Sequence, residues 1–519
     1  MSAVPRSDPP LPSHRDTTIL RPRRRWRRLF LLALLLIWAG TALWQVFKPM
    51  PAGTNLASDW VDTPVADVRW LADTTVTDGH GRLLIRQHVF DEVLGIIGAA
   101  KQFVVLDFYL FNDWPDAADT ADGAGAASSA VHRKISEELK ARLIARRKAV
   151  PDLKVLFITD PVNDLYGAWP SAALAELRGA GVDVVITDLD ILRDPNPAYS
   201  ALWRPLGTWS TDHAGDRGAL ANPLDVGPET VSLPMWLRMF NFKANHRKTL
   251  VADDGRGGLV ALLTSADAND GGSAHSNVGL RFGGPLARTA LDSELRIARL
   301  SGWQSTWQPP EVSAPQKDQQ AVRLRYLSEG AIERELLAAI ETAHSGESIS
   351  IAALYLSDRD VIDALRAAAA RDVRVRLILD PNKDMYGRQH DGVPNRPAAA
   401  ELVRQSGGRI ECRWYRTHGE QFHATLAMVR RGDALWAMLG SAQLTRRQLD
   451  NFNLNADVAL EADLDTPLAQ ELVNYFETLW QNDPVALREY TTDFQIYEDQ
   501  SFPRYWRYRL MEAAGLGAF

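Results

Sequence analysis

An internal repeat constrains the fold of this chain more strongly than any other feature of its sequence. Residues 160–167 read DPVNDLYG, and residues 380–387 read DPNKDMYG, an offset of 220 positions (380 − 160 = 220). Each copy follows an apolar run typical of a buried strand and precedes a run with helical spacing, at 172–178 and 398–405. Because the string recurs in the same context, the sequence predicts a tandem duplication of an α/β unit.

The runs around the two copies predict the elements of this fold. Apolar residues at helical spacing predict helices, and short apolar runs predict buried strands. The expected helices are at 83–100 and 135–147, and the expected strands are at 103–109, 153–158 and 373–379. A Gly-, Ala- and Asp-rich segment at 117–130 has the composition of an inserted loop.

A second repeat, at the ends of the two halves, locates a pair of histidines. The segment 294–303 is echoed by the segment 471–480, an offset of 177 (480 − 303 = 177). Adding this offset to His246 gives position 423, which is also a histidine. Two strands that carry histidine, one from each half, can therefore meet across a pseudo-twofold interface.

The stretch 241–253 (NFKANHRKTLVAD) has the chemistry of a phosphate site. His246 and Lys248 are two residues apart, so the alternation of a strand points both side chains to one side. A histidine can attack phosphorus and transfer protons, and a lysine can hold a phosphoryl oxygen. A bare His-x-Lys also occurs on ordinary strands with a basic edge, and the partner His423 is what favours function.

These residues resemble the signature of the phospholipase D superfamily, which is two copies of HxKxxxxD, each followed by a Gly-Ser or similar pair and an Asn. His246, Lys248 and Asp253 match the first copy at every defining position, and Ser265 with Asn269 resembles the segment that follows it. The resemblance extends from about residue 65 to residue 480.

The second copy of the motif is degenerate. His423 is kept, but Thr425 stands at the lysine position, Arg430 at the aspartate position, and Gln443 where Asn is usual. Arg430 or Arg431 is a candidate substitute for the lost cation, although an Arg-Arg-Gly-Asp string is more typical of a basic turn.

The resemblance implies a tandem duplication of an α-β-α sandwich with two pseudo-twofold lobes, which needs no metal and no cofactor. It also implies that one histidine forms a phosphohistidine, while the other protonates the leaving alcohol and then activates water or an acceptor alcohol. We expect His246 to be the nucleophile and His423 the acid/base, although the roles can be exchanged. Lys248 and Asp253 join them as catalytic residues by resemblance. The expected substrate-binding residues are Ser265, Asn269 and Ser441.

In the superfamily a carboxylate or amide late in each half orients the histidine. The positions that resemble it are Asn277 and Asp457. A carboxylate fixes a tautomer and stabilises an imidazolium better than an amide does, which favours His423 as the acid/base.

The N-terminal part of the chain has the pattern of a membrane anchor. Residues 29–47 (LFLLALLLIWAGTALWQVF) carry no charge, and about 19 such residues span a bilayer core. Arginines crowd the segment 21–28, and by the positive-inside rule everything after Lys48 lies on the opposite face, the periplasm of a bacterium. A cleaved signal sequence and a buried helix are the alternatives to this single-pass inner-membrane anchor.

The patterns divide the chain as follows: 1–28, a disordered basic cytoplasmic segment; 29–47, the transmembrane anchor; 48–64, a linker; 65–303, the first half; 304–321, a linker; 322–482, the second half; and 483–519, a C-terminal extension.

Two further segments are candidates for contact with lipid. The segment 204–236 is rich in Pro and Gly and lies among Trp203, Trp209 and Trp236, which fits either a lid at the membrane interface or a long surface loop. The run 504–510 mixes basic and aromatic residues, as a membrane-surface helix or a helix docked on the domain would.

Composition narrows the range of expected substrates. The net charge of −7 argues against strong binding to nucleic acid, and the single cysteine, Cys412, excludes an internal disulfide. With an anchor in the bilayer, we expect a membrane phospholipid as substrate and a phosphodiesterase (hydrolase) or phosphatidyltransferase as the activity. The alternatives are a pseudoenzyme that binds phospholipid and a periplasmic nuclease. The head group, the acceptor and the oligomeric state stay open.

Overall fold

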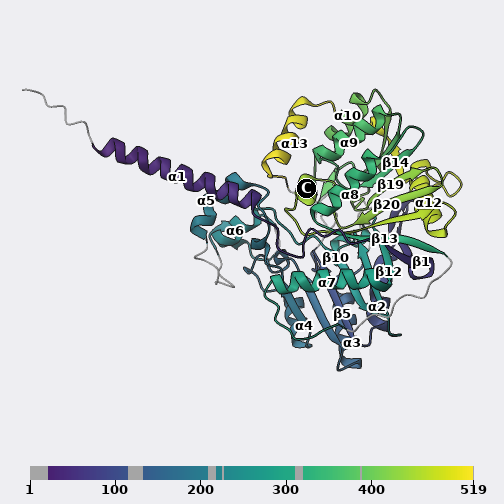
Figure 1. Ribbon diagram of the computed structural model, residues 1–519, viewed down its shortest axis with the longest axis horizontal. Helices are drawn as coiled ribbons and strands as arrows, with labels where there is room; N and C mark the ends of the chain where they lie inside the picture. The colour runs from purple at the N-terminus through teal and green to yellow at the C-terminus, as the bar shows by residue number, and fades with distance from the viewer. Residues whose placement is uncertain are drawn as a thin grey trace, which may run out of the picture.

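Two mixed β-sheets, one for each half of the chain, form the frame of the protein (Figure 1). The computed structural model describes residues 22–114, 132–207, 218–224, 227–309, 320–385 and 388–517. Several predictions lie outside these residues: the loop at 117–130, Trp209, Tyr386 and Gly387 of the second repeat, and most of the basic N-terminal segment.

The two sheets share one strand order over seven strands, which confirms the predicted duplication. The first sheet runs β2 (Arg69–Ala72), β12 (Val278–Gly283), β11 (Leu259–Thr264), β10 (Lys248–Asp253), β5 (Phe103–Phe108), β6 (Lys154–Thr159), β7 (Asp183–Ile186). The second runs β1 (Val61–Pro64), β13 (Ala321–Ser328), β21 (Ala456–Asp463), β20 (Ala434–Gly440), β19 (Thr425–Arg431), β14 (Ser348–Ala353), β15 (Arg374–Leu379), β18 (Ile410–Tyr415), β22 (Thr491–Asp493). In each sheet one strand, β5 in the first and β14 in the second, pairs antiparallel on one side and parallel on the other.

Helices cover both faces of each sheet, so each half is an α-β-α sandwich. The outer helices are α2 (Val89–Ala99), α3 (Ile135–Ala149) and α4 (Ala172–Gly179) in the first half, and α8 (Gly330–Glu341), α9 (Arg359–Ala370) and α10 (Asn395–Gln405) in the second. The inner helices α7 (Gly284–Leu300) and α12 (Pro467–Gln481) share one core with both sheets. This shared core fixes the two halves against each other.

The inner helices follow the expected amphipathic spacing. In α7 the buried residues Ala287, Leu291, Leu295 and Ala298 recur every three or four positions, which turns one face of the helix to the core.

The remaining elements are short or lie outside the sandwich. They are the strands β3 (Thr74–Thr77), β4 (Leu83–Arg86), β8 (Leu220–Ala221), β9 (Thr230–Val231), β16 (Asp384–Met385) and β17 (Arg388–Gln389), and the helices α1 (Pro22–Phe47), α5 (Pro197–Gly207), α6 (Leu233–Met239), α11 (Arg446–Leu449) and α13 (Phe502–Ala514).

The helix predicted at 83–100 is only partly correct. Residues 83–86 form strand β4, which pairs with β3, and the helix begins at Val89. The carboxylate of Asp73 accepts the main-chain N–H groups of His88 and Val89, at 2.6 and 3.1 Å, and so fixes the start of the helix.

Both edges of the second sheet come from segments predicted to lie outside it. Strand β1, within the expected linker 48–64, pairs with β13, and strand β22, within the expected C-terminal extension 483–519, pairs with β18. The second lobe is therefore larger than residues 322–482.

Helix α1 projects from the sandwich (Figure 1). It begins at Pro22, so residues 22–28, expected to be disordered, are helical. Among the described residues, one helix is long and apolar enough to cross a membrane, at Arg25–Phe47. The C-terminal part of α1 packs along α5, which lies at the start of the segment predicted as a lid or loop.

Candidate active site

The repeated aspartates hold the chain just before each histidine. One carboxylate oxygen of Asp160 accepts the N–H of Asn245 at 2.7 Å, and one oxygen of Asp380 accepts the N–H of Phe422 at 2.8 Å. The second oxygen of each binds its own turn. Burial raises the pKa of both carboxyls to about 7. The internal repeat thus positions the residues that precede His246 and His423.

Main-chain hydrogen bonds exchanged between the halves bring the two histidines together. The N–H of His246 donates to the carbonyl of Leu454 at 2.8 Å, and the N–H of Ser276 donates to the carbonyl of Gln421 at 3.1 Å. His246 and His423 both line one cavity of about 260 Å³. The structure therefore places the two sequence-predicted imidazoles in the same site.

The ring of His246 is held across the interface. Its Nδ1 atom lies 3.3 Å from Oδ1 of Asn455, whose Nδ2 donates to the carbonyl of Gln448 at 2.9 Å. Because that second bond fixes the amide orientation, the oxygen faces the ring and the Nδ1 atom carries the proton. The Nε2 atom of His246 is then left with its lone pair.

His423 has a looser setting. Asn277 is the counterpart in the first half of Asn455 in the second. Each asparagine directly precedes the residue whose carbonyl accepts the N–H of the serine, Ser265 or Ser441. The amide oxygen of Asn277 accepts from the hydroxyl of Ser265 at 3.1 Å, and the buried Nδ1 atom of His423 has no side-chain hydrogen-bond partner within the described part of the chain. The ring of His275 lies 5.6 Å from that of His423, centre to centre.

Both imidazoles are neutral near pH 7. Burial lowers the pKa of His246 well below its ordinary value, and the charges of Lys248, His423 and Arg447 lower it further. Burial also lowers the pKa of His423, with His275 and Lys248 adding to the effect. An anionic ligand in the cavity would reverse the effect of these charges.

Lys248 is buried under the histidine. Its Nζ atom donates to the carbonyl of His246 at 3.1 Å and lies 3.5 Å from a carboxylate oxygen of Asp267. It also sits 5.2 Å from the centre of the Tyr109 ring. Asp267 lines the cavity, and Lys248 lies behind it as its buried counter-ion.

The second half replaces this ion pair with a neutral pair. The hydroxyl of Thr425 donates to the side-chain oxygen of Gln443 at 3.0 Å. Gln443 follows its serine by two residues, as Asp267 does in the first half. The loss of the lysine is thus matched by the loss of its carboxylate, so this pair introduces no unpaired charge.

Comparisons with known proteins agree with this geometry. Residues 336–480 match a family model described as "Cardiolipin synthase, PLD-like domain". That match falls on the degenerate half, while the full motif lies in the other half. The match confirms the resemblance to the phospholipase D superfamily that the sequence predicted.

The fold is also similar to solved structures. Phosphatidylserine synthase from Haemophilus influenzae Rd KW20 matches with a TM-score of 0.52 at 10% identity, over 93% of this chain and 99% of that chain. A polyphosphate kinase from Porphyromonas gingivalis matches at 0.42 (13% identity, 86% and 53% coverage), and a phospholipase D family member from Salmonella typhimurium at 0.25 (21%, 30% and 95%). A search of curated protein sequences finds no match.

One phospholipase D motif residue is not in the site. The carboxylate of Asp253 accepts the N–H groups of Lys101, Gln102 and Phe103 at 2.7–3.0 Å and does not line the cavity. Asp253 therefore ties the end of β10 to the start of β5, away from the cavity that the two histidines line, and its expected catalytic role stays a prediction. Arg430 stands at the corresponding position of the second half.

Two of the predicted orienting and binding roles also change. Asp457 accepts the N–H of Ala442 at 3.0 Å, and Asn455, two residues earlier, is the residue that contacts His246. The hydroxyls of Ser265 and Ser441 accept N–H groups of the adjacent strand and do not line the cavity.

Sequence reasoning missed several residues that line the cavity. Asn269 was predicted and lines the cavity. Asp267, His275 and Arg447 also line it but were not predicted. The signal for Asp267 was present, because aligning Ser265 with Ser441 pairs it with Gln443. Arg447 lies in α11, on a segment without a motif, and its Nη1 atom donates to the carbonyl of Phe242 at 3.3 Å.

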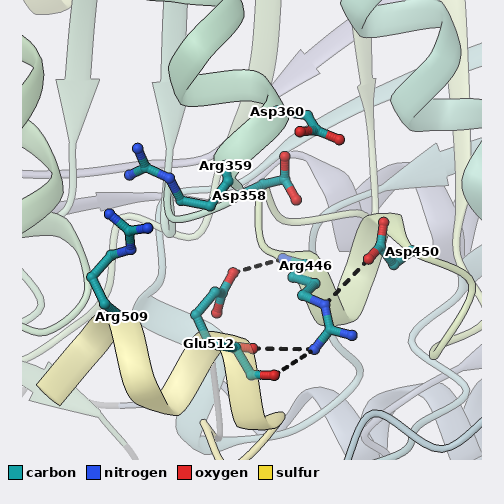
Figure 2. Close-up of a pocket in the computed structure, with 8 residues that line it drawn as sticks. Asp358, Arg359, Asp360, Arg446, Asp450, Arg509 and Glu512 are labelled. Carbon is teal, nitrogen blue, oxygen red and sulfur yellow. Dashed lines mark hydrogen bonds and ion pairs between the residues drawn. The ribbon is translucent and has the colours of Figure 1, made fainter. Parts of the chain in front are cut away.

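A group of acidic side chains lies elsewhere. Glu333, Asp358 and Asp450 have ligand oxygens within 4.8 Å of one another, within the described part of the chain. Figure 2 shows Asp358 and Asp450 in a pocket beside α13, lined by residues that do not line the histidine cavity. Nothing in the two-histidine chemistry draws on this group.

Proposed function

We propose that the protein is a phosphodiesterase or phosphatidyltransferase that acts on membrane phospholipids through a phosphohistidine. The observation that carries this proposal is the pair of buried, neutral imidazoles, one from each half, that line a single cavity. Such a pair can divide one displacement at phosphorus into two easier steps.

In the first step the Nε2 lone pair of His246 attacks phosphorus, and the bond from phosphorus to the leaving alcohol breaks. His423, which takes up a proton from solvent when the anionic diester binds, gives that proton to the alcohol as an imidazolium and becomes neutral. In the second step His423 takes a proton from water or an acceptor alcohol, whose oxygen attacks phosphorus and releases His246. Asn455 supports His246 as the nucleophile because it holds the Nδ1–H tautomer. Asp457, the earlier reason for this assignment, contacts neither ring among the described hydrogen bonds.

Two cations would hold the phosphoryl oxygens in this scheme. Lys248 lies beneath His246, and Arg447, from the second half, lines the same cavity and acts electrostatically on His246. Arg447 therefore replaces the lysine missing at Thr425. Arg430 is exposed, and Arg431 donates to the carbonyl of Ala339, so neither expected substitute reaches the cavity.

The walls of the cavity favour a lipid diester. Beside the polar groups it is lined by apolar and aromatic side chains, which suit the glycerol end of a phospholipid: Trp114, Leu224, Met239 and Phe242. The family model and the phosphatidylserine synthase fold support a phospholipid-modifying enzyme. Helix α1 would hold it in the bacterial inner membrane, with the catalytic domain on the periplasmic face by the arginine rule.

A pseudoenzyme is the second candidate, because the neutral Thr425–Gln443 pair is what a binding protein without turnover would retain. The acidic net charge speaks against the nuclease alternative.

Turnover by the full chain, reconstituted in vesicles of mixed phospholipids, tests the proposal. Released head group reports hydrolysis, and a new phosphatidyl ester of a lipid alcohol reports transfer. His246→Ala should abolish both, whereas His344→Ala, which removes an exposed histidine, should leave both intact. Lipid turnover that is equal in wild type and His246→Ala would contradict the proposal. Cleavage of single-stranded DNA alone would favour the nuclease.

A further inference from the structure

The C-terminal helix α13 is docked on the second lobe by one face. Tyr508 is fully buried, and its hydroxyl donates to Glu401 at 3.2 Å. The carboxylate of Glu512 accepts from the hydroxyl of Ser357 and from the N–H of Arg446, both at 2.8 Å. Figure 2 shows Glu512 turned toward Arg446. Of the two predictions for residues 504–510, the docked helix is therefore correct.

The opposite face of α13 is apolar and exposed. Phe502, Trp506 and Leu510 are 71%, 47% and 66% exposed. They are four residues apart, so they form one stripe along the helix. Large apolar side chains are stabilised when they are removed from water, and these three stay exposed to it. The stripe therefore has the character of a contact surface.

The C-terminal end of α13 lies close to the C-terminal end of α1. A Cβ atom at Gly515, the residue after the helix, would overlap the main chain of Pro195. The neighbouring Asp194 donates its N–H to the carbonyl of Gln45 at 3.0 Å, and Lys48 donates to the carbonyl of Asp190 at 2.8 Å. One short segment, 190–196, thus fixes the ends of both helices.

Helix α5 continues the same surface along α1. The indole N–H of Trp38, within the apolar run of α1, donates to the carbonyl of Ala198 at 3.0 Å. Leu202 on α5 is 66% exposed. In Figure 1, α5 and α13 lie on the side of the molecule from which α1 projects.

We propose that this face, defined by Leu202 on α5 and by Phe502, Trp506 and Leu510 on α13, rests on the bilayer that α1 enters. The inference depends on the proposed membrane location of α1 and not on catalysis. A lipid occupant is favoured because the face is continuous with the anchor through segment 190–196. Arg507 and Arg509 also flank the stripe, as arginines do in helices that lie on anionic lipid.

A bilayer contact would make the anchor rigid. The catalytic domain would then not swing on a tether but would keep one orientation to the membrane, since α1, α5 and α13 are joined by direct hydrogen bonds and close packing.

A site-directed fluorescence experiment tests the contact. The full chain, with Cys412→Ala and one new cysteine, carries a polarity-sensitive probe in vesicles of phosphatidylethanolamine and phosphatidylglycerol that contain lipid with a nitroxide near the head group. Trp506→Cys reports on the stripe. Val485→Cys is the matched control, because Val485 is 94% exposed and follows α12, on the far side of the molecule (Figure 1).

The probe at 506 should lose most of its fluorescence to the nitroxide lipid, and the probe at 485 should keep its own. Leu510→Cys should behave as Trp506→Cys does. Equal quenching at 506 and 485 in vesicle-bound protein would overturn the proposal. Shielding at 506 that depends on protein concentration and not on lipid would also overturn it, in favour of contact between copies. Because the readout needs no turnover, failure of the catalytic proposal stays separate.

Discussion

At the scale of single residues, the two halves differ most at the pair beneath each histidine. Lys248 with Asp267 is an ion pair, and Thr425 with Gln443 is a neutral hydrogen bond. Since each half keeps a matched pair, the asymmetry is a stable arrangement of the site and not a single damaged position.

Restoring the ion pair in the second half should therefore need both residues. Thr425→Lys alone buries an ammonium without its carboxylate and should gain little activity. The double change Thr425→Lys with Gln443→Asp should raise kcat/KM by more than the two single changes together. The extra gain should correspond to a coupling free energy of about 0.5–3 kcal/mol. The mirror variant, Lys248→Thr with Asp267→Gln, should abolish turnover. A single Thr425→Lys variant as active as the double would show that the pairing is irrelevant.

Arg447 should affect both rate and pH dependence. Arg447→Gln should lower kcat by about 10²–10³-fold, as loss of one charge-stabilising donor does. The pKa of His246 is lowered by burial, and then by cations that include Arg447. Removing that cation should raise this pKa, so the acidic limb of the kcat/KM profile should move to higher pH. A lower kcat with an unmoved limb would assign Arg447 a purely structural role.

The histidines could be predicted from the sequence, but their partners could not. His423 follows from His246 by the repeat offset, because register in a duplicated fold is preserved. Asn455 was missed in favour of Asp457, since spacing alone does not say which of two neighbouring polar residues faces the ring. Arg447 was missed because α11 carries no motif. Tertiary packing alone brings this helix to the cavity.

At the scale of elements, Asp253 matches the sequence motif but joins two strands. Its carboxylate accepts three main-chain N–H groups at the junction of β10 and β5. Asp253→Asn would place donors against those N–H groups. We expect a loss of about 1.5–3 kcal/mol in the free energy of unfolding, measured by urea titration in mild detergent, with kcat per folded molecule unchanged. A large drop in kcat without loss of stability would return Asp253 to the catalytic group.

Element predictions succeeded where apolar runs are long and failed at boundaries. The buried strands near residues 103–109, 153–158 and 373–379 are present as β5, β6 and β15. The helix at 83–100 lost its first turn to β4, because Asp73 caps the chain at His88 and Val89. No local pattern identifies β1 and β22 as edges, since their pairing partners lie far away in the sequence.

At the scale of the whole molecule, a buried ion pair joins the halves. The guanidinium of Arg247, one residue from His246, lies 2.7 Å from Glu329 of the second half and 3.3 Å from Glu294. All three side chains are fully buried. The orientation of the two lobes, on which the shared cavity depends, therefore rests in part on this contact.

Arg247→Met should cost about 3–5 kcal/mol in the free energy of unfolding, because it leaves two buried carboxylates without a cation. The exposed pair of Arg323 and Glu461 is the matched control, and Arg323→Gln should cost less than about 1 kcal/mol. Similar losses for the two variants would mean that the buried pair does not hold the lobes.

Covalent trapping tests the central claim most directly. The full chain is mixed in vesicles with phospholipid labelled with ³²P in its diester, quenched in base during turnover, and digested so that the labelled peptide can be mapped. We predict label on His246 in the wild type, a slower rise of label on His246 in His423→Ala, which lacks both the acid of the first step and the base of the second, and no label in His246→Ala. Label on His423, or turnover of the lipid without any labelled histidine, would contradict the account.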